Sequence, residues 1–203
     1  MRAFLILHGW GNFRPPGHWQ YELAAALRER GERVVYPQLP DAQQPDLEAW
    51  RTAAAAALDE ARADDARVTV IAHSLGAALW LGARPDDAED DTEDEDDTDA
   101  GAGRSVDRVL LVAPPSPSYL RANPEVAAFA ALEPTRPAAE TRIVASDADP
   151  CNPEGARVVF AEPLGIPLTT IPAGGHLTPA SGYGTWPSVL DWCLDPTATI
   201  VPR

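Results

Sequence analysis

Apolar residues recur along this chain with two different periods. Short runs rich in Val, Ile and Leu are typical of buried strands, which we expect near residues 2–7, 32–36, 67–73, 106–113, 140–146 and 166–171. Segments with helical spacing lie between them, and we expect helices near residues 18–30, 46–63, 75–83, 123–132, 153–161 and 184–194. Strands that alternate with helices predict an α/β fold: one mostly parallel sheet of about six strands, with helices on both faces, in a single domain over residues 1–203.

The third predicted strand ends in a pentapeptide with serine at its centre, Ala72-His73-Ser74-Leu75-Gly76. Small residues two positions before and after the serine allow the next helix to pack close to the strand. Ala72 stands where glycine is usual, which adds only one methyl group. A strand, a serine and a helix in this order predict a nucleophile elbow, with the serine hydroxyl exposed at the carboxyl edge of the sheet.

Two further groups follow Ser74 in the order nucleophile, acid, base that this kind of site requires. Asp147 and Asp149 come directly after the predicted strand 140–146, and either could be the acid. His176 follows the predicted strand 166–171 in a loop that contains Gly174 and Gly175. The other three histidines all precede Ser74 in the chain: His8, His18 and His73. His176 is therefore the candidate base.

These motifs together resemble the small serine hydrolases of the RBBP9/YdeN family, a compact branch of the α/β-hydrolase fold. The stretches His8-Gly9-Trp10 and Tyr36-Pro37-Gln38-Leu39-Pro40 add to the resemblance, which covers nearly the whole chain. The resemblance implies that the acid is Asp149, the Asp directly before Pro150, rather than Asp147. It leaves the natural substrate open.

A Ser-His-Asp triad of this kind predicts a serine hydrolase that works through an acyl-enzyme. We expect the backbone N–H groups of Leu75 and Trp10 to stabilise the oxyanion. Residues 114–139 follow a strand end and form only a minimal lid, so the expected substrate is a small ester, thioester or amide. The predicted pocket residues are Gly9, Trp10, Phe13, Pro115, Tyr119 and Leu120. An acyltransferase with the same triad, or a binding protein on the same fold, are the alternatives.

The net charge of −15 is concentrated in one segment. Residues 86–99 contain eleven acidic residues and no basic one, and the rest of the chain has 20 acidic against 16 basic residues. A run of like charges with nothing apolar to bury predicts a disordered insertion over residues 85–104. A solvated loop is the simpler interpretation, and a protein partner for it has no other support.

Several kinds of chemistry have no matching motif. All 16 basic residues are Arg, so chemistry that needs Lys is excluded. We find no phosphate-binding glycine loop, basic patch or metal-ligand spacing, which predicts no cofactor, metal or nucleic-acid partner. Cys151 and Cys193 do not make a disulfide framework. No segment resembles a membrane span or signal peptide, so we expect no membrane partner and a cytoplasmic location.

Overall fold

A six-stranded parallel sheet forms the centre of the computed structural model, which describes residues 1–82, 106–138 and 140–203. The strands lie in the order β2-β1-β3-β4-β5-β6. Their bounds are β1 Arg2–Leu7, β2 Arg33–Val35, β3 Arg67–His73, β4 Arg108–Val112, β5 Glu140–Ser146 and β6 Leu168–Ile171. The predicted α/β fold is confirmed, while the acidic insertion at 85–104 lies outside the described residues.

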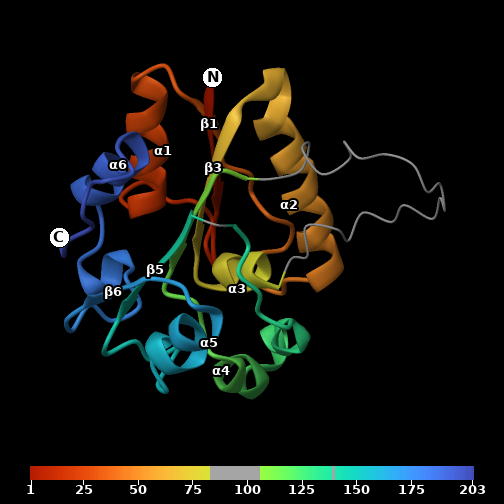
Figure 1. Cartoon of the computed structure of the whole chain (residues 1–203). Coiled ribbons are helices and arrows are strands. Elements are labelled where there is room, and N and C mark those ends of the chain that lie inside the picture. The colour runs from red at the N-terminus through yellow and green to blue at the C-terminus, as the bar shows by residue number, and fades with distance from the viewer. Residues whose placement is uncertain (83–105, 139) are drawn as a thin grey trace, which may run out of the picture.

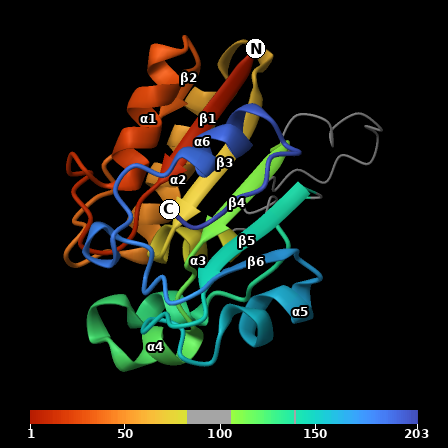
Figure 2. The same ribbon diagram turned by 90° about the vertical axis from the view of Figure 1, so that its left-hand side faces the viewer.

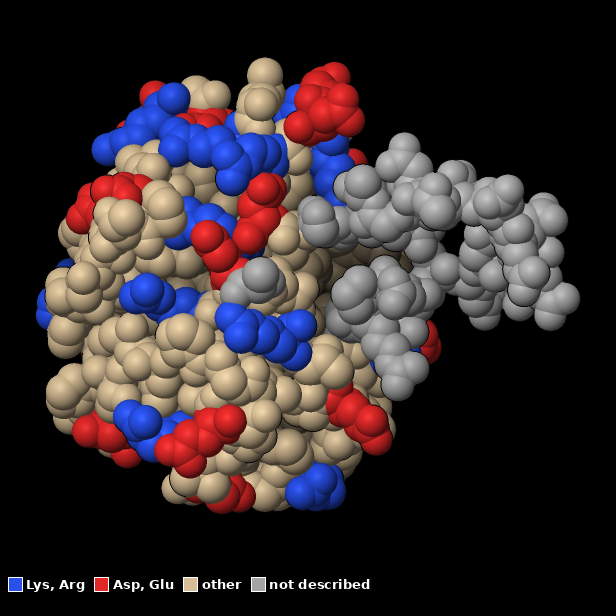
Figure 3. Space-filling view, in the orientation of Figure 1, with Lys and Arg blue, Asp and Glu red and all other residues tan. Residues whose placement is uncertain are grey.

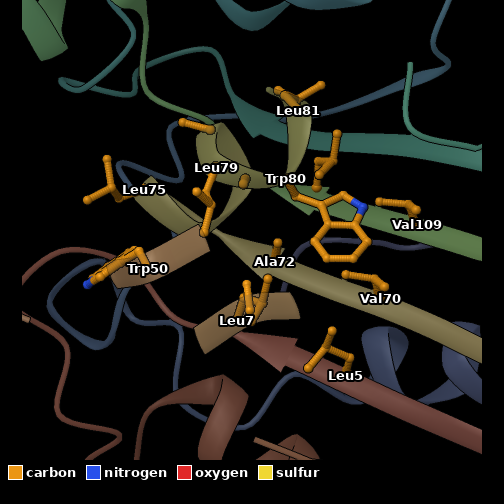
Figure 4. Packing of buried hydrophobic residues seen from close by; sticks show 14 of the residues in the cluster. Leu5, Leu7, Trp50, Val70, Ala72, Leu75, Leu79, Trp80, Leu81 and Val109 are labelled. Carbon is orange, nitrogen blue, oxygen red and sulfur yellow. The ribbon is translucent and has the colours of Figure 1, made fainter. Parts of the chain in front are cut away.

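Alternation of side chains along each strand produces a separate core on each face of the sheet. In β1, Leu5 and Leu7 belong to one cluster, whereas Phe4 and Ile6 belong to the other. All of these residues are fully buried, because helices cover both faces. Figure 4 shows the first cluster, where Trp80 and Leu79 of the helix after β3 lie over Val70 and Ala72.

The helices divide between the two faces in agreement with these clusters (Figures 1 and 2). Helices α1 (Trp19–Glu29) and α6 (Pro187–Leu194) contact each other and supply apolar residues to the cluster around Phe4. Helices α2 (Leu47–Arg62) and α3 (Leu75–Leu81) pack on the opposite face. Asp46 caps α2 by accepting a hydrogen bond from the N–H of Ala49, as expected at a helix N-terminus.

Strand order reverses between β1 and β3. The chain passes from β1 outward to β2, returns to β3 on the other side of β1, and then continues outward to β6. Ligands of open α/β sheets bind at such a switch point, beyond the carboxyl ends of the strands. Leu7 pairs with Ala72 there, so the loop after β1 and the predicted elbow after β3 lie side by side.

The helical prediction was least accurate in the segments that follow β4 and β5. After β4, a short helix α4 (Pro117–Ala122) precedes a 3₁₀ segment (Pro124–Ala131), where one helix at 123–132 was predicted. After β5, the predicted helix 153–161 is replaced by a π-helical turn (Arg157–Ala161) that continues into α5 (Glu162–Leu164). Pro163 follows this π-helical turn and has no N–H to donate back to it.

On the face shown in Figure 3, acidic and basic side chains are intermingled over the described surface. This agrees with the near balance of charge outside residues 86–99. Among the described helices, none has both the length and the apolar character needed to cross a bilayer.

Candidate active site

Ser74 lies in a sharp turn between β3 and α3. Its φ of 54° is in the left-handed region, which is unfavourable for a residue with a side chain. The turn is held by a hydrogen bond of 2.9 Å from the N–H of Ser74 to the carbonyl of Val112. The helix also requires glycine at position 76, because a Cβ there would lie 2.5 Å from the carbonyl oxygen of His8.

The ring of His176 joins Ser74 to Asp149. Its Nε2 lies 2.7 Å from Oγ of Ser74, and its Nδ1 lies 2.9 Å and 3.0 Å from the two carboxylate oxygens of Asp149. With the Nδ1 proton directed to Asp149, Nε2 carries a lone pair that faces the serine hydroxyl. This is the arrangement in which an imidazole can take a proton from serine.

The structure also separates the two candidate acids. Asp149 is 5 % exposed and reaches His176, whereas Asp147 is exposed and accepts a hydrogen bond of 2.7 Å from the N–H of Ala173. Asp147 thus holds the loop that carries His176 without contacting the ring. Ser146 supports the same loop, since its Oγ accepts a hydrogen bond of 2.8 Å from the N–H of Gly174.

The surroundings of His176 change its pKa in opposite directions. Burial of the ring lowers the pKa, but the hydrogen bond and charge of Asp149 and the neighbouring Cys151 raise it, to a net value of about 9. His73 differs, because burial and its histidine neighbours lower its pKa well below the ordinary value. The ring of His73 therefore stays neutral, and its Nε2–H donates to the backbone carbonyl of His176 at 3.1 Å.

The remaining two histidines, His8 and His18, lie near the site and hydrogen-bond to the backbone of neighbouring loops and helices. In His8, Nδ1 lies 2.9 Å from the carbonyl of Gly9, and Nε2 accepts from the N–H of Leu39. His18 caps α1 by accepting from the N–H of Gln20. Burial lowers the pKa of both rings to about 4, so both are neutral at physiological pH.

A cavity of about 320 Å³ opens onto Ser74 and His176. Five of the predicted pocket residues line it: Gly9, Trp10, Pro115, Tyr119 and Leu120. Phe13 does not, and this prediction was wrong. The amide of Asn12 turns toward the ring of His18 at 3.3 Å, and the next side chain, Phe13, points outward and is 56 % exposed.

Sequence reasoning missed other lining residues because they come from different loops and helices. They are Gly11, Asn12, Pro15, His18, His73, Val126, Cys151, Thr178 and Pro179. The position of Cys151, two residues after Asp149, was a signal that the thiol would lie near the acid. The other residues carried no comparable signal.

Both expected oxyanion donors belong to residues that line this cavity. Leu75 is the first residue of α3, where backbone N–H groups lack partners within the helix. Trp10 lies in the loop after β1, and its indole N–H donates to the carbonyl of Gln43 at 2.9 Å. Gly9 brings that loop against the elbow, since a Cβ at Gly9 would lie 2.7 Å from Cβ of Ser74.

Comparison with known proteins gives a consistent result. Residues 4–194 match the protein family described as Serine hydrolase. The ydeN gene product from B. subtilis has a similar structure, with 19% identity, a TM-score of 0.72, and coverage of 94% of this chain and 96% of that one. A YdeN-like hydrolase from Pectobacterium atrosepticum has 20% identity and a TM-score of 0.66, with 95% and 90% covered.

A third structure, Est1E from Butyrivibrio proteoclasticus, has 16% identity and a TM-score of 0.65, with 96% of this chain and 87% of that one covered. A search of curated proteins found no match.

Proposed function

This chain belongs to the serine hydrolase family, and from that premise we propose that Ser74, His176 and Asp149 are the catalytic triad of an enzyme that cleaves a small ester. The observation that carries the proposal is the continuous hydrogen-bonded path from Oγ of Ser74 through the His176 ring to the Asp149 carboxylate. A protein that only binds a partner has no need to keep these three groups aligned.

In the proposed mechanism, Oγ of Ser74 attacks the ester carbonyl while Nε2 of His176 takes its proton. Asp149 stabilises the imidazolium through the Nδ1 hydrogen bond. The N–H groups of Leu75 and Trp10 stabilise the oxyanion, and one such donor is worth about 3 kcal/mol in the transition state. His176 then protonates the departing alcohol, and water, activated in the same way, releases the acid from Ser74.

The size of the cavity supports a small substrate. Its volume of about 320 Å³ is near the lower end of ligand pockets, which run from about 300 to about 1,000 Å³. Trp10, Leu120 and Val126 present apolar surface beside Ser74. We therefore expect p-nitrophenyl acetate to be hydrolysed readily and long-chain esters poorly. Thioesters and small amides are attacked by the same chemistry.

A fluorophosphonate probe tests the proposal directly, because it labels only an activated serine. Wild-type protein should be labelled at Ser74, and Ser74→Ala should lose both labelling and esterase activity while its thermal melt stays nearly unchanged. The control is Ser118→Ala, which removes a serine hydroxyl outside the triad and should retain labelling. Esterase activity that survives in pure Ser74→Ala protein would refute the assignment.

Acyl transfer to an acceptor other than water is the second candidate function, since the same triad supports it. Hydrolysis in the presence of a primary alcohol distinguishes the two functions, because a transferase forms the new ester in preference to the free acid.

A further inference from the structure

The thiol of Cys151 lies beside the proposed triad, although the mechanism above makes no use of it. Cys151 follows Asp149 in the turn after β5, and its N–H donates to Oδ1 of Asp149 at 2.9 Å. Its Sγ, a carboxylate oxygen of Asp149 and a ring nitrogen of His176 all lie within 4.8 Å of one another. Asp149 is buried, while Cys151 and His176 are half-buried at the wall of the cavity. Three different ligand types thus meet at a surface that solutes can reach.

This combination of ligand atoms selects one class of metal ion. Zn²⁺ binds thiolate sulfur, imidazole nitrogen and carboxylate oxygen in tetrahedral sites, and three protein ligands leave one position for water. A thiolate ligand disfavours Mg²⁺ and Ca²⁺, which prefer oxygen. Ligand atoms around Zn²⁺ are about 3.3–3.8 Å apart, given bond lengths of about 2.0–2.3 Å. The observed limit of 4.8 Å therefore needs a shift of about 1 Å, within the reach of a χ1 rotation of Cys151.

We propose that Asp149, Cys151 and His176 bind a borderline-soft divalent cation such as Zn²⁺, and that the bound ion switches the hydrolase off. The switch rests on the proposed function, whereas the metal site itself does not. On binding, the thiol releases its proton to water, the proton on Nδ1 of His176 also leaves through water, and the Nδ1 lone pair goes to the metal. In a neutral ring one proton returns from water to Nε2, whereas an imidazolium already carries it there. The single ring proton must then reside on Nε2, where the ring cannot accept the proton of Ser74.

Geometry alone supports the position of the thiol. Its Sγ lies within 4.8 Å of the ligand atoms of both Asp149 and His176, and Cys151 lines the cavity together with Tyr119 and His176.

Metal binding can be measured without turnover. Co²⁺ titrated into the Zn²⁺-free protein should give a thiolate-to-cobalt charge-transfer band in the near ultraviolet, and Zn²⁺ should displace it with a stoichiometry of one per chain. Excess Ca²⁺ is kept in the buffer so that surface carboxylates, including those of residues 86–99, do not contribute to the Co²⁺ and Zn²⁺ titrations. Cys151→Ala should lose the band and bind Zn²⁺ at least tenfold more weakly. Cys193→Ala is the matched control. Cys193 is buried in the core cluster around Phe4, so its substitution should leave metal binding unchanged.

Inhibition is then measured as a fraction of each variant's own rate without metal. Zn²⁺ should inhibit wild type and Cys193→Ala equally, with full recovery on addition of EDTA, and Cys151→Ala should need at least tenfold more Zn²⁺. Equal affinity of wild type and Cys151→Ala for Zn²⁺ would overturn the site. Binding through Cys151 that leaves the rate unchanged would overturn the switch.

The outcome for the metal site is separable from that for the proposed function. If the protein hydrolyses no ester, the cobalt spectrum and the Zn²⁺ titration still decide whether the site exists. If it hydrolyses esters but gives no thiolate band, the triad stands and the metal site is refuted.

Discussion

His176 is held between groups that favour opposite protonation states. Burial disfavours the imidazolium, but Asp149 and Cys151 more than compensate, so the pKa rises to about 9. Only the neutral ring can act as the base, and a pKa above the ordinary value moves the onset of activity to higher pH.

The pH dependence of kcat/KM should follow this pKa. We expect the rate on a neutral ester to rise about tenfold per pH unit below the pKa and to level off near pH 9, with EDTA present throughout. Asp149→Asn removes the charge that raises the pKa, and it should move the acid limb to lower pH while reducing kcat. A flat profile between about pH 5 and about pH 8 would show that His176 is not the base.

His73 acts on the same ring through the backbone. It donates to the carbonyl of His176 between two residues with positive φ, Gly175 at 55° and Leu177 at 51°. His73→Phe keeps the aromatic packing but loses the donor, and a hydrogen bond worth about 1 kcal/mol corresponds to about fivefold in kcat. His73→Gln, which retains an N–H donor, should recover part of the loss.

The decisive measurement for His73 is the division between kcat and KM, together with the pH profile. A positioning role predicts a lower kcat, an unchanged KM and an acid limb at lower pH in His73→Phe. A purely structural role would lower the melting temperature and leave kcat of the folded protein as in wild type.

Chain order and strand ends predicted Ser74 and His176 and limited the acid to Asp147 or Asp149, and the resemblance to the RBBP9/YdeN family then favoured Asp149. All of these residues lie within five positions of a strand's carboxyl end, and the carboxyl ends of parallel strands share one edge of the sheet. The roles of His73 and Cys151 could not be predicted in this way. Their contacts with His176 depend on how the loop at 173–177 folds back over β3, and no periodicity in the sequence encodes that path.

At the scale of elements, the segment after β4 forms one wall of the cavity. Ser116 caps α4 by accepting from the N–H of Tyr119, and Pro117 occupies the first turn. This start signal was present in the sequence, but a helix of six residues is too short to show a helical period. The 3₁₀ segment that follows contributes Val126, which is 1 % exposed and lines the cavity.

Val126→Ala should therefore change the acyl-chain preference. Removing two methyl groups enlarges the cavity, and burial of one further CH₂ of substrate is worth about 0.8 kcal/mol. We expect the ratio of kcat/KM for butyrate over acetate esters to rise severalfold, with a stability loss of about 1–2 kcal/mol. The matched control is Val158→Ala, because Val158 is 63 % exposed and lies outside the cavity. An unchanged ratio would mean that the acyl chain lies elsewhere.

At the scale of the whole molecule, the start of β4, which follows the acidic run in the chain, lies at the edge of the sheet opposite the site. Ser74 follows the carboxyl end of β3, whereas the backbone N–H of Asp107 donates to the carbonyl of Val68 near the amino end of the same strand. Six residues of strand separate these positions, or about 20 Å. The segment that contains the acidic run follows Gly82 at the end of α3 and ends before Val106, which precedes β4 at the edge opposite the triad.

Replacing residues 86–99 with a short Gly/Ser linker should consequently leave kcat/KM for a neutral small ester within about threefold of wild type. A neutral substrate is not steered by charge, and physiological salt screens the potential of exposed charges beyond about 8 Å. The replacement removes eleven negative charges, so retention on an anion exchanger should fall sharply. Removal of like-charge repulsion and shortening of the loop should keep the melting temperature equal or raise it. Activity could instead collapse while the melting temperature and the Co²⁺ charge-transfer band stay as in wild type. That result would mean that the run reaches the carboxyl edge of the sheet. Residues 86–99 would then have to be treated as part of the substrate or acceptor site, in spite of where the sheet attaches them.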